Sequence, residues 1–285
     1  AQQFFTSIAT VFVDGEPTET GTFPPASDVA LALGSPGLDS ETATNFGVGF
    51  TWQSEGGFNL TVDYYNIKIK DRIVLSSNLS GAGIEALLAG TGANRARFFL
   101  NGIDSKTEGV DVVLNYTADL GNGGQLRLNA GYNYNKTEVT DVIDPPSELA
   151  AVGVEQDNLF SFNEFTRFER GSPRSKINLS ANWSLQKWQV VARSTRYGET
   201  WDPSATPDRN EILPSKWISD LDVKYDLSER ISLSLGVNNL FDVYPLATRD
   251  NVADVTTFSR IFPYSGFSPF GFSGRFLYGR VEVSF

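Results

Sequence analysis

Three residue types are missing from this chain of 285 residues: it contains no histidine, no cysteine and no methionine. Without histidine and cysteine the chain can form no Ser/His/Asp or Cys/His catalytic group, no His/Cys zinc site and no disulfide. Haem ligation by His or Met is excluded on the same ground. The chemistry that remains is that of carboxylates, amides, arginines and aromatic rings.

Positive charge and long apolar runs are also scarce. The sequence has 23 Lys and Arg against 34 Asp and Glu, a net charge of −11, which argues against a nucleic-acid partner because such surfaces are basic. No segment reaches the ~18–20 consecutive apolar residues that a membrane-spanning helix needs. The first residues show no charged leader before an apolar stretch, so we expect no signal peptide there.

Aromatic residues and a regular alternation of apolar with polar residues dominate what is present. The chain has 21 Phe, 10 Tyr and 5 Trp, and the alternation recurs in segments of about ten residues, as in membrane barrel strands. The pattern predicts about nine strands, near residues 46–52, 58–64, 97–116, 126–134, 177–183, 188–193, 217–225, 231–237 and 277–285. We expect an all-β fold.

The connections between these segments alternate between tight turns and long excursions. Tight turns are predicted near 54–57, 120–124, 184–187 and 226–229, and long loops near 76–94, 141–172, 199–213 and 243–273. Outer-membrane barrels have short turns on one side and long loops on the other, with aromatic girdles at the strand ends. This pattern favours a transmembrane barrel over a soluble β-sandwich, which also alternates.

Five segments resemble the C-terminal half of the barrel of TonB-dependent outer-membrane receptors, in family order, and one of them, residues 101–111, resembles the strand after residues 60–73. Residues 38–50 (LDSETATNFGVGF) resemble a strand opening, and residues 60–73 (LTVDYYNIKIKDRI) resemble the strand that follows. Residues 236–245 (GVNNLFDVYP) resemble the penultimate strand and the loop after it, and residues 279–285 (GRVEVSF) resemble the terminal strand with its final aromatic. The resemblance covers residues 38–285.

The resemblance implies an antiparallel transmembrane β-barrel of about 22 strands, of which this chain supplies about nine to ten. We therefore expect residues 1–43 to be an extracellular loop or a partial strand, residues 44–285 to be the C-terminal barrel portion, and the plug domain to be absent. A short helix is also predicted near residues 83–90, as the cap of a loop.

The implied function is energy-coupled uptake of a scarce ligand, such as a siderophore or a carbohydrate, across the outer membrane of a Gram-negative bacterium. No bond is made or broken in uptake, so we expect no enzyme, no cofactor and no metal site. The implied partners are outer-membrane lipid and lipopolysaccharide, the barrel-assembly machinery, TonB through the missing plug region, and an unidentified small molecule. Two alternatives stay open: a small self-contained barrel (an adhesin or passive pore), with residues 4–13 as its tenth strand, and a soluble carbohydrate-binding sandwich.

Ligand-binding residues are expected on the long loops, because loops held by a rigid scaffold concentrate binding residues. Aromatic rings beside arginine suit a sugar, a peptide or an aromatic metal chelate. The candidates lie in the loops 141–172 and 243–273: Phe162, Phe165, Arg167, Phe168, Arg170, Arg260, Tyr264 and Phe267.

The terminal strand carries a different candidate role. We expect Val281, Val283 and Phe285 to form the barrel-assembly signal and to face lipid, whereas residues 280, 282 and 284 face the lumen. Lumen charges are expected to pair along a strand, Lys224 with Asp220 and Asp222, and Arg280 with Glu282. The amides of residues 238–242 are expected to satisfy backbone groups rather than bind a ligand.

Overall fold

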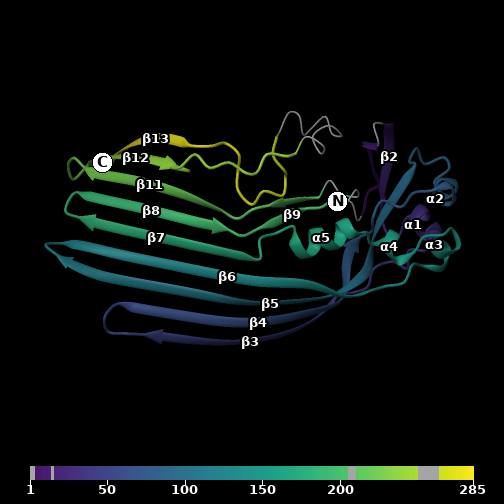
Figure 1. The fold of residues 1–285 in the computed structure, drawn as a ribbon, viewed down its shortest axis with the longest axis horizontal. Coiled ribbons are helices and arrows are strands. Elements are labelled where there is room, and N and C mark those ends of the chain that lie inside the picture. The colour runs from purple at the N-terminus through teal and green to yellow at the C-terminus, as the bar shows by residue number, and fades with distance from the viewer. Residues whose placement is uncertain (1–3, 14–15, 205–209, 250–262) are drawn as a thin grey trace.

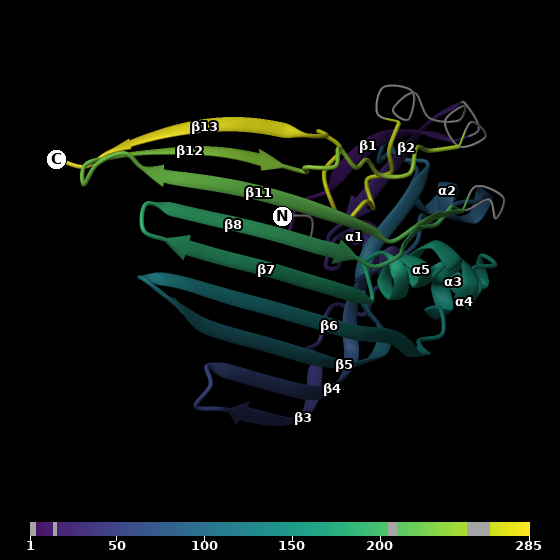
Figure 2. The ribbon, with the colours of Figure 1, turned by 60° about the vertical axis from the view of Figure 1, so that its left-hand side comes forward.

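The computed structural model describes residues 4–13, 16–204, 210–249 and 263–285. In this part of the chain, nine strands follow one another in one continuous antiparallel wall (Figures 1 and 2). In spatial order they are β3 (Thr42–Gln53), β4 (Phe58–Leu75), β5 (Arg95–Gly121), β6 (Gly124–Val142), β7 (Ser175–Leu185), β8 (Trp188–Tyr197), β11 (Lys216–Asp226), β12 (Ile231–Asn238) and β13 (Phe276–Val283). None of the helices described is long and apolar enough to cross a membrane.

Eight of the nine predicted segments lie wholly within one of these strands, and the ninth, 277–285, extends two residues past the end of β13. The all-β expectation is confirmed. The longest strands, β4, β5 and β6, have 18, 27 and 19 residues and exceed the segments predicted for them. Most of the added residues of β5, 117–121, lie beside a tight turn, whereas those of β4 and β6 lie mainly at the end of the wall that carries the long loops. We call this end the mouth and the opposite end the turn end.

The strand register places apolar residues beside apolar residues on one face of the wall. Leu221 pairs with Val237, which pairs in turn with Leu277. In the last strand Val281 pairs with Leu233, so residue 281 lies on the apolar face as the alternation predicts, and Glu282, next to it, pairs with Ser232 on the other face. The apolar face is exposed, with Leu277 71% and Leu235 73% accessible.

Four tight connections join the strands at the turn end, where they were predicted. Asn122 and Gln186 adopt left-handed backbone conformations there, with φ of 52° each, which tightens the turn. Gly57 has φ of 80°, and a Cβ at this position would lie 2.3 Å from the carbonyl oxygen of Thr117. Only glycine fits this turn, because it has no Cβ.

The mouth is covered by a helical cap, which contains the buried core of the described residues. Its helices are α1 (Asp28–Ala32), α2 (Ala82–Leu87), α3 (Ser147–Ala151), α4 (Gln156–Leu159) and α5 (Phe162–Arg170). Figures 1 and 2 both place these helices at the end opposite the tight turns and the C-terminus. Leu33, Ile84, Phe98, Leu149 and Leu159 are fully or almost fully buried and belong to a single cluster.

The cap confirms one expectation and corrects another. The predicted short helix near residues 83–90 is α2, whose side chain Ile84 is 1% exposed. Residues 141–172, expected as a loop, instead contain three helices. They fold because Leu149, Leu159 and Phe160 bury apolar surface against β5, and this burial stabilises short helices that are marginal alone.

Residues 7–13 and 16–23 form a pair of antiparallel strands at the mouth rather than a wall strand (Figure 2). β1 (Ser7–Val13) pairs with β2 (Glu16–Phe23), and β2 pairs in parallel with the first residues of β5. A small closed barrel would need β1 to join the outer strands β3 and β13, and no such pairing exists among the described residues. A second pair of short antiparallel strands, β9 (Thr200–Asp202) with β10 (Glu211–Leu213), follows β8 and precedes β11 along the chain.

Candidate functional site

Helix α5 carries most of the predicted ligand-binding residues. Glu164 lies in its first turn and Arg167 and Arg170 in its last turn, which suits the helix dipole. Phe165 and Phe168 are three residues apart and so share one face of the helix. Both rings pack against the core cluster of the cap, which fixes the helix on the mouth.

Helix α5 borders a cavity of about 390 Å³ between the cap and the mouth ends of β4, β5 and β6. Three of the predicted residues line it, namely Phe165, Arg167 and Phe168. Phe160, Arg97 and Glu164 line it as well. The cavity therefore combines three aromatic rings with two guanidinium groups and one carboxylate.

The charges of this cavity are not equivalent. Glu164 is held by local bonds, since its carboxylate accepts hydrogen bonds from the hydroxyl of Ser77 at 2.9 Å and from the hydroxyl of Ser161. The Arg167 side chain is 49% exposed and lies 3.8 Å from the Glu164 carboxylate. Arg97 donates to the hydroxyl of Thr22 at 2.8 Å. Arginine is thus the group most available to a ligand.

The two long loops meet at this helix. The guanidinium of Arg167 lies over the ring of Phe267, 5.7 Å from its centroid, and that of Arg170 lies 5.4 Å from the ring of Trp201. The Thr200 hydroxyl donates to the carbonyl of Phe267 at 3.3 Å, which ties the loop 243–273 to β9. Cation–π contacts of this kind contribute about 0.5–2 kcal/mol each.

Other predicted residues lie away from the cavity. Tyr264 stacks between Tyr244 and Phe272, at 6.1 and 6.0 Å. Phe162 is 54% exposed and does not line the cavity, and Arg260 lies outside the described residues. The structure brings together Phe165, Arg167, Phe168 and Phe267, and separates Tyr264 and Phe162 from them.

Two arginines at the site come from strands and were missed. Arg97 lines the cavity from β5, and the guanidinium of Arg72 in β4 lies over the Phe168 ring, 4.6 Å from its centroid. The expectation that loops alone carry recognition left them out. A signal was available for Arg97, which stands directly before the phenylalanine pair at residues 98 and 99.

Residues 1–240 match the protein family described as TonB dependent receptor-like, beta-barrel. The chain belongs to this family. TonB-dependent receptors are receptors and transporters of the Gram-negative outer membrane, and they are not enzymes. Within the described residues no group of three or more Asp and Glu side chains is arranged to hold a metal ion.

Comparisons with known proteins agree with this assignment. The chain is 23% identical over 207 residues to the ferripyoverdine receptor of Pseudomonas aeruginosa, a match that covers 72% of this chain and 22% of that receptor. The fold is similar to that of a mutant ferric enterobactin receptor from P. aeruginosa (TM-score 0.56, 19% identity, 95% of this chain and 33% of the other). It is also similar to the FrpB iron transporter from Neisseria meningitidis (TM-score 0.55, 16% identity, 87% and 32%).

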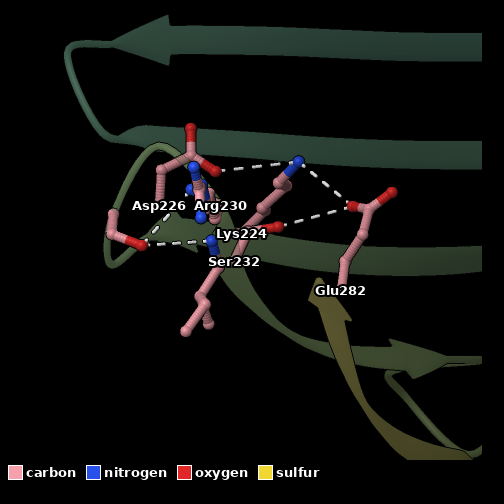
Figure 3. Close-up of polar contacts among 7 residues, drawn as sticks. Lys224, Asp226, Arg230, Ser232 and Glu282 are labelled. Atoms are coloured by element: carbon pink, nitrogen blue, oxygen red, sulfur yellow. Dashed lines mark hydrogen bonds and ion pairs between the residues drawn. The ribbon is translucent and has the colours of Figure 1, made fainter. Parts of the chain in front are cut away.

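The polar face of this receptor barrel segment has ion pairs that differ from the expected ones. Lys224 lies 3.3 Å from Glu282 and 3.7 Å from Asp226, as Figure 3 shows. Asp220 instead accepts from the backbone amide of Asn239, and Asp222 accepts from the hydroxyl of Tyr278, each at 2.8 Å. The expected pairs are therefore wrong: Lys224 pairs with Asp226 in its own strand and with Glu282 of β13, while Asp220 and Asp222 accept from other groups.

Residues 238–242 have the structural role that was expected of them. The Asn239 side chain accepts from the amide of Val243 at 2.9 Å and donates to its carbonyl at 2.8 Å. Asp242 accepts from the amide of Arg275 at 2.8 Å. These bonds hold the chain where β12 ends and the last long loop begins.

Proposed function

We propose that this chain is the C-terminal wall and part of the mouth of an outer-membrane receptor that takes up a scarce ligand by energy coupling through TonB. The chain spans 22% of the curated relative that it matches and about a third of the solved structures (33% and 32%). The relatives named for ferripyoverdine, ferric enterobactin and iron make an iron chelate the first ligand class to test.

The observation that carries this proposal is the convergence of two loops far apart in sequence on one cavity. Arg167 lines the cavity and at the same time contacts Phe267 of the other loop. The Arg167 side chain is partly exposed, and the rings of Phe160, Phe165 and Phe168 line the same cavity. This arrangement suits an anionic or aromatic ligand, because arginine binds carboxylates and phenolates as hydrogen-bond acceptors and also stacks on flat rings.

The wall supports the same proposal. Both outer strands of the nine-stranded wall, β3 and β13, pair on one side only among the described residues. Unpaired N–H and C=O groups cannot be left in lipid, so we propose that the remaining strands of a larger barrel continue from these edges. A plug inside that barrel would face the polar side of the wall, which carries Lys224 and Glu282.

The test uses the full-length receptor and a panel of iron-loaded siderophores, with uptake of radioactive iron as the measurement. We expect Arg167→Ala to lower uptake of the recognised chelate at least tenfold. Phe162→Ala is the matched control, since Phe162 lies on the same helix but outside the cavity. Equal uptake by both variants and the wild type would contradict a binding role for the cavity.

A further inference from the structure

The two oxygens of the Glu164 carboxylate have different surroundings. Oε2 accepts hydrogen bonds from the hydroxyl of Ser77, at 2.9 Å, and from the hydroxyl of Ser161. Oε1 lies 3.8 Å from a guanidinium nitrogen of Arg167. One oxygen therefore holds parts of the cap together, whereas the other faces the arginine that is most available to a ligand.

Ser77 anchors the first turn of α5 from a distant part of the chain. Its hydroxyl accepts from the backbone amide of Ser161, the N-cap residue of α5, at 2.8 Å. Its own amide donates to the carbonyl of Leu159 at 2.9 Å. Ser77 is buried just after the end of β4. Because the Ser161 side chain makes no capping bond to the helix backbone, Ser77 and Glu164 together hold this end of the helix.

The other end of α5 is attached to the wall. Glu169 accepts from the backbone amide of Val139 in β6 at 2.9 Å. The helix has nine residues, and a helix of this length is marginal on its own in water. Its position therefore depends on these attachments and on the rings that it buries. The backbone of Arg167, between Glu164 and Glu169, is fixed relative to the cavity, so that only its side chain is left to be oriented.

Glu164 also sets the charge of the cavity. Of the side chains that line it, Arg97 and Arg167 are positive and Glu164 is negative, which leaves one net positive charge. We infer that Glu164 is a positioning residue, which holds the Arg167 guanidinium at the cavity while its charge competes with the ligand for that guanidinium. The cavity then suits a ligand that offers one carboxylate or phenolate beside a flat ring. This inference rests on the proposed function in assigning ligand binding to Arg167.

Two substitutions separate the two roles of Glu164. In Glu164→Gln the side-chain oxygen still accepts from both hydroxyls, while an NH₂ group replaces the oxygen that faces Arg167 and the negative charge is lost. Ser77→Ala keeps the charge and removes the anchor. Opposite effects follow. An anion should bind more tightly to the first variant, because no carboxylate competes for Arg167, and more weakly to the second, because the ligand must then order the Arg167 side chain itself.

The test measures binding of radiolabelled benzoate, a flat anion, to the full-length receptor in detergent by equilibrium dialysis at low salt. Glu164→Gln should bind benzoate about two- to fivefold more tightly than the wild type, the range for a partly exposed charge pair. It should bind the neutral benzamide as the wild type does. Ser77→Ala should bind benzoate about two- to tenfold more weakly. Hydrogen exchange of the α5 amides without ligand should be unchanged in Glu164→Gln and faster in Ser77→Ala.

The matched controls are Ser147→Ala and Glu148→Gln. The hydroxyl of Ser147 donates to the Glu148 carboxylate at 2.9 Å at the beginning of α3, and neither residue lines the cavity. Both controls should bind benzoate like the wild type. Heat-modifiable migration on a gel checks that each variant is folded. If Ser77→Ala does not fold, Ser161→Ala takes its place, since it removes the other hydroxyl that donates to Glu164.

Three results would overturn the inference. Weaker benzoate binding by Glu164→Gln would leave Glu164 with a structural role only. Binding by the serine variant at least as tight as that of the wild type would show that the anchor does not position Arg167. Equal binding by Arg167→Ala and the wild type would show that benzoate does not reach this arginine. Normal uptake of iron-loaded siderophores by Arg167→Ala would instead contradict the proposed function alone, because benzoate binding does not depend on which ligand is transported.

Discussion

The wall and the cap of this protein place their apolar side chains in opposite ways. In the wall, large apolar side chains such as Leu235 and Leu277 lie on an exposed face, 73% and 71% accessible. In the cap, Leu33 and Phe98 are fully buried among helices and the first residues of β5. We interpret the difference as one chain that folds against two solvents, with lipid covering the wall and the protein itself covering the core of the cap.

The strand β5 belongs to both regions and so shows where one solvent replaces the other. Its first residues, among them Phe98 and Leu100, are buried in the cap. Its later residues, including Val110 and Val112, alternate with polar residues on the wall. The change occurs within one unbroken strand of 27 residues, which couples the position of the cap to the wall.

The largest effect is expected from a cavity in the cap. Phe98→Ala should cost about 3–5 kcal/mol of cap stability, because the ring is fully buried and the surrounding helices cannot close the gap. Hydrogen exchange of the mouth segments in the full-length receptor measures this cost. The control is Phe46→Ala on the wall, where the ring is 61% exposed and faces lipid. If both variants lost similar amide protection from hydrogen exchange in the cap, the cap and the wall would not differ in how they are stabilised.

The next effect concerns the depth of the wall in the bilayer. Leu277 pairs with Val237, which pairs with Leu221. In β11, Leu221 lies midway between Trp217 and Tyr225, so Leu277 lies near the middle of the wall. Leu277→Arg should therefore cost about 2–4 kcal/mol, and Val283→Arg, beside the turn end, about 0–1 kcal/mol. Denaturant unfolding of the full-length receptor in lipid measures both. Asn129→Arg on the polar face is the control. If it lowered the free energy of unfolding as much as Leu277→Arg does, the apolar face could not be the face that contacts lipid.

A smaller effect is expected on the polar face. Tyr278→Phe removes the 2.8 Å hydrogen bond to the Asp222 carboxylate and should cost about 1–3 kcal/mol, the range for hydrogen bonds to charged groups. Tyr225→Phe is a suitable control, since this ring lies against Trp188 with centroids 4.5 Å apart and keeps that contact. Equal losses in the two variants would show that the bond to Asp222 contributes nothing specific.

The smallest effect is a titration in the last long loop. The negative charge of Asp242 raises the pKa of the Tyr244 hydroxyl above its ordinary value. Asp242→Asn should lower this pKa, because the phenolate is no longer repelled. The measurement is an ultraviolet titration of the wild type and of Asp242→Asn. In each case the titration of the same protein with Tyr244→Phe added is subtracted, which leaves the signal of Tyr244 alone. An unchanged pKa would show that the two side chains do not interact in solution.

The sequence predicted the wall well and the cap poorly, for a physical reason. The alternation of apolar and polar residues is a property of consecutive residues. Residues 277–285 therefore indicate a strand and its two faces even when the neighbouring strand is not known. The helices of residues 147–170 have no such local signal, because they depend on burial of Leu149, Leu159 and Phe160 against β5. Tertiary burial of this kind cannot be derived from short segments.

The candidate site was predicted in part for the same reason. Phe165, Arg167 and Phe168 were found because aromatic and charged residues cluster in their segment. Arg72 and Arg97 were missed because they become neighbours of that segment only when the long mouth ends of β4 and β5 meet the cap. The assembly role of Phe285 and its neighbours Val281 and Val283 stays a prediction.

The most direct test of the two-solvent account is spin-label accessibility along β13 in the full-length receptor, reconstituted in lipid. Labels are placed singly at residues 280 to 283 and exposed to oxygen, which collects in the bilayer, and to a water-soluble nickel complex. The account predicts that labels replacing Val281 and Val283 collide mainly with oxygen, and that labels replacing Arg280 and Glu282 collide mainly with nickel. Equal accessibility to both reagents at all four positions, or the reverse alternation, would contradict it.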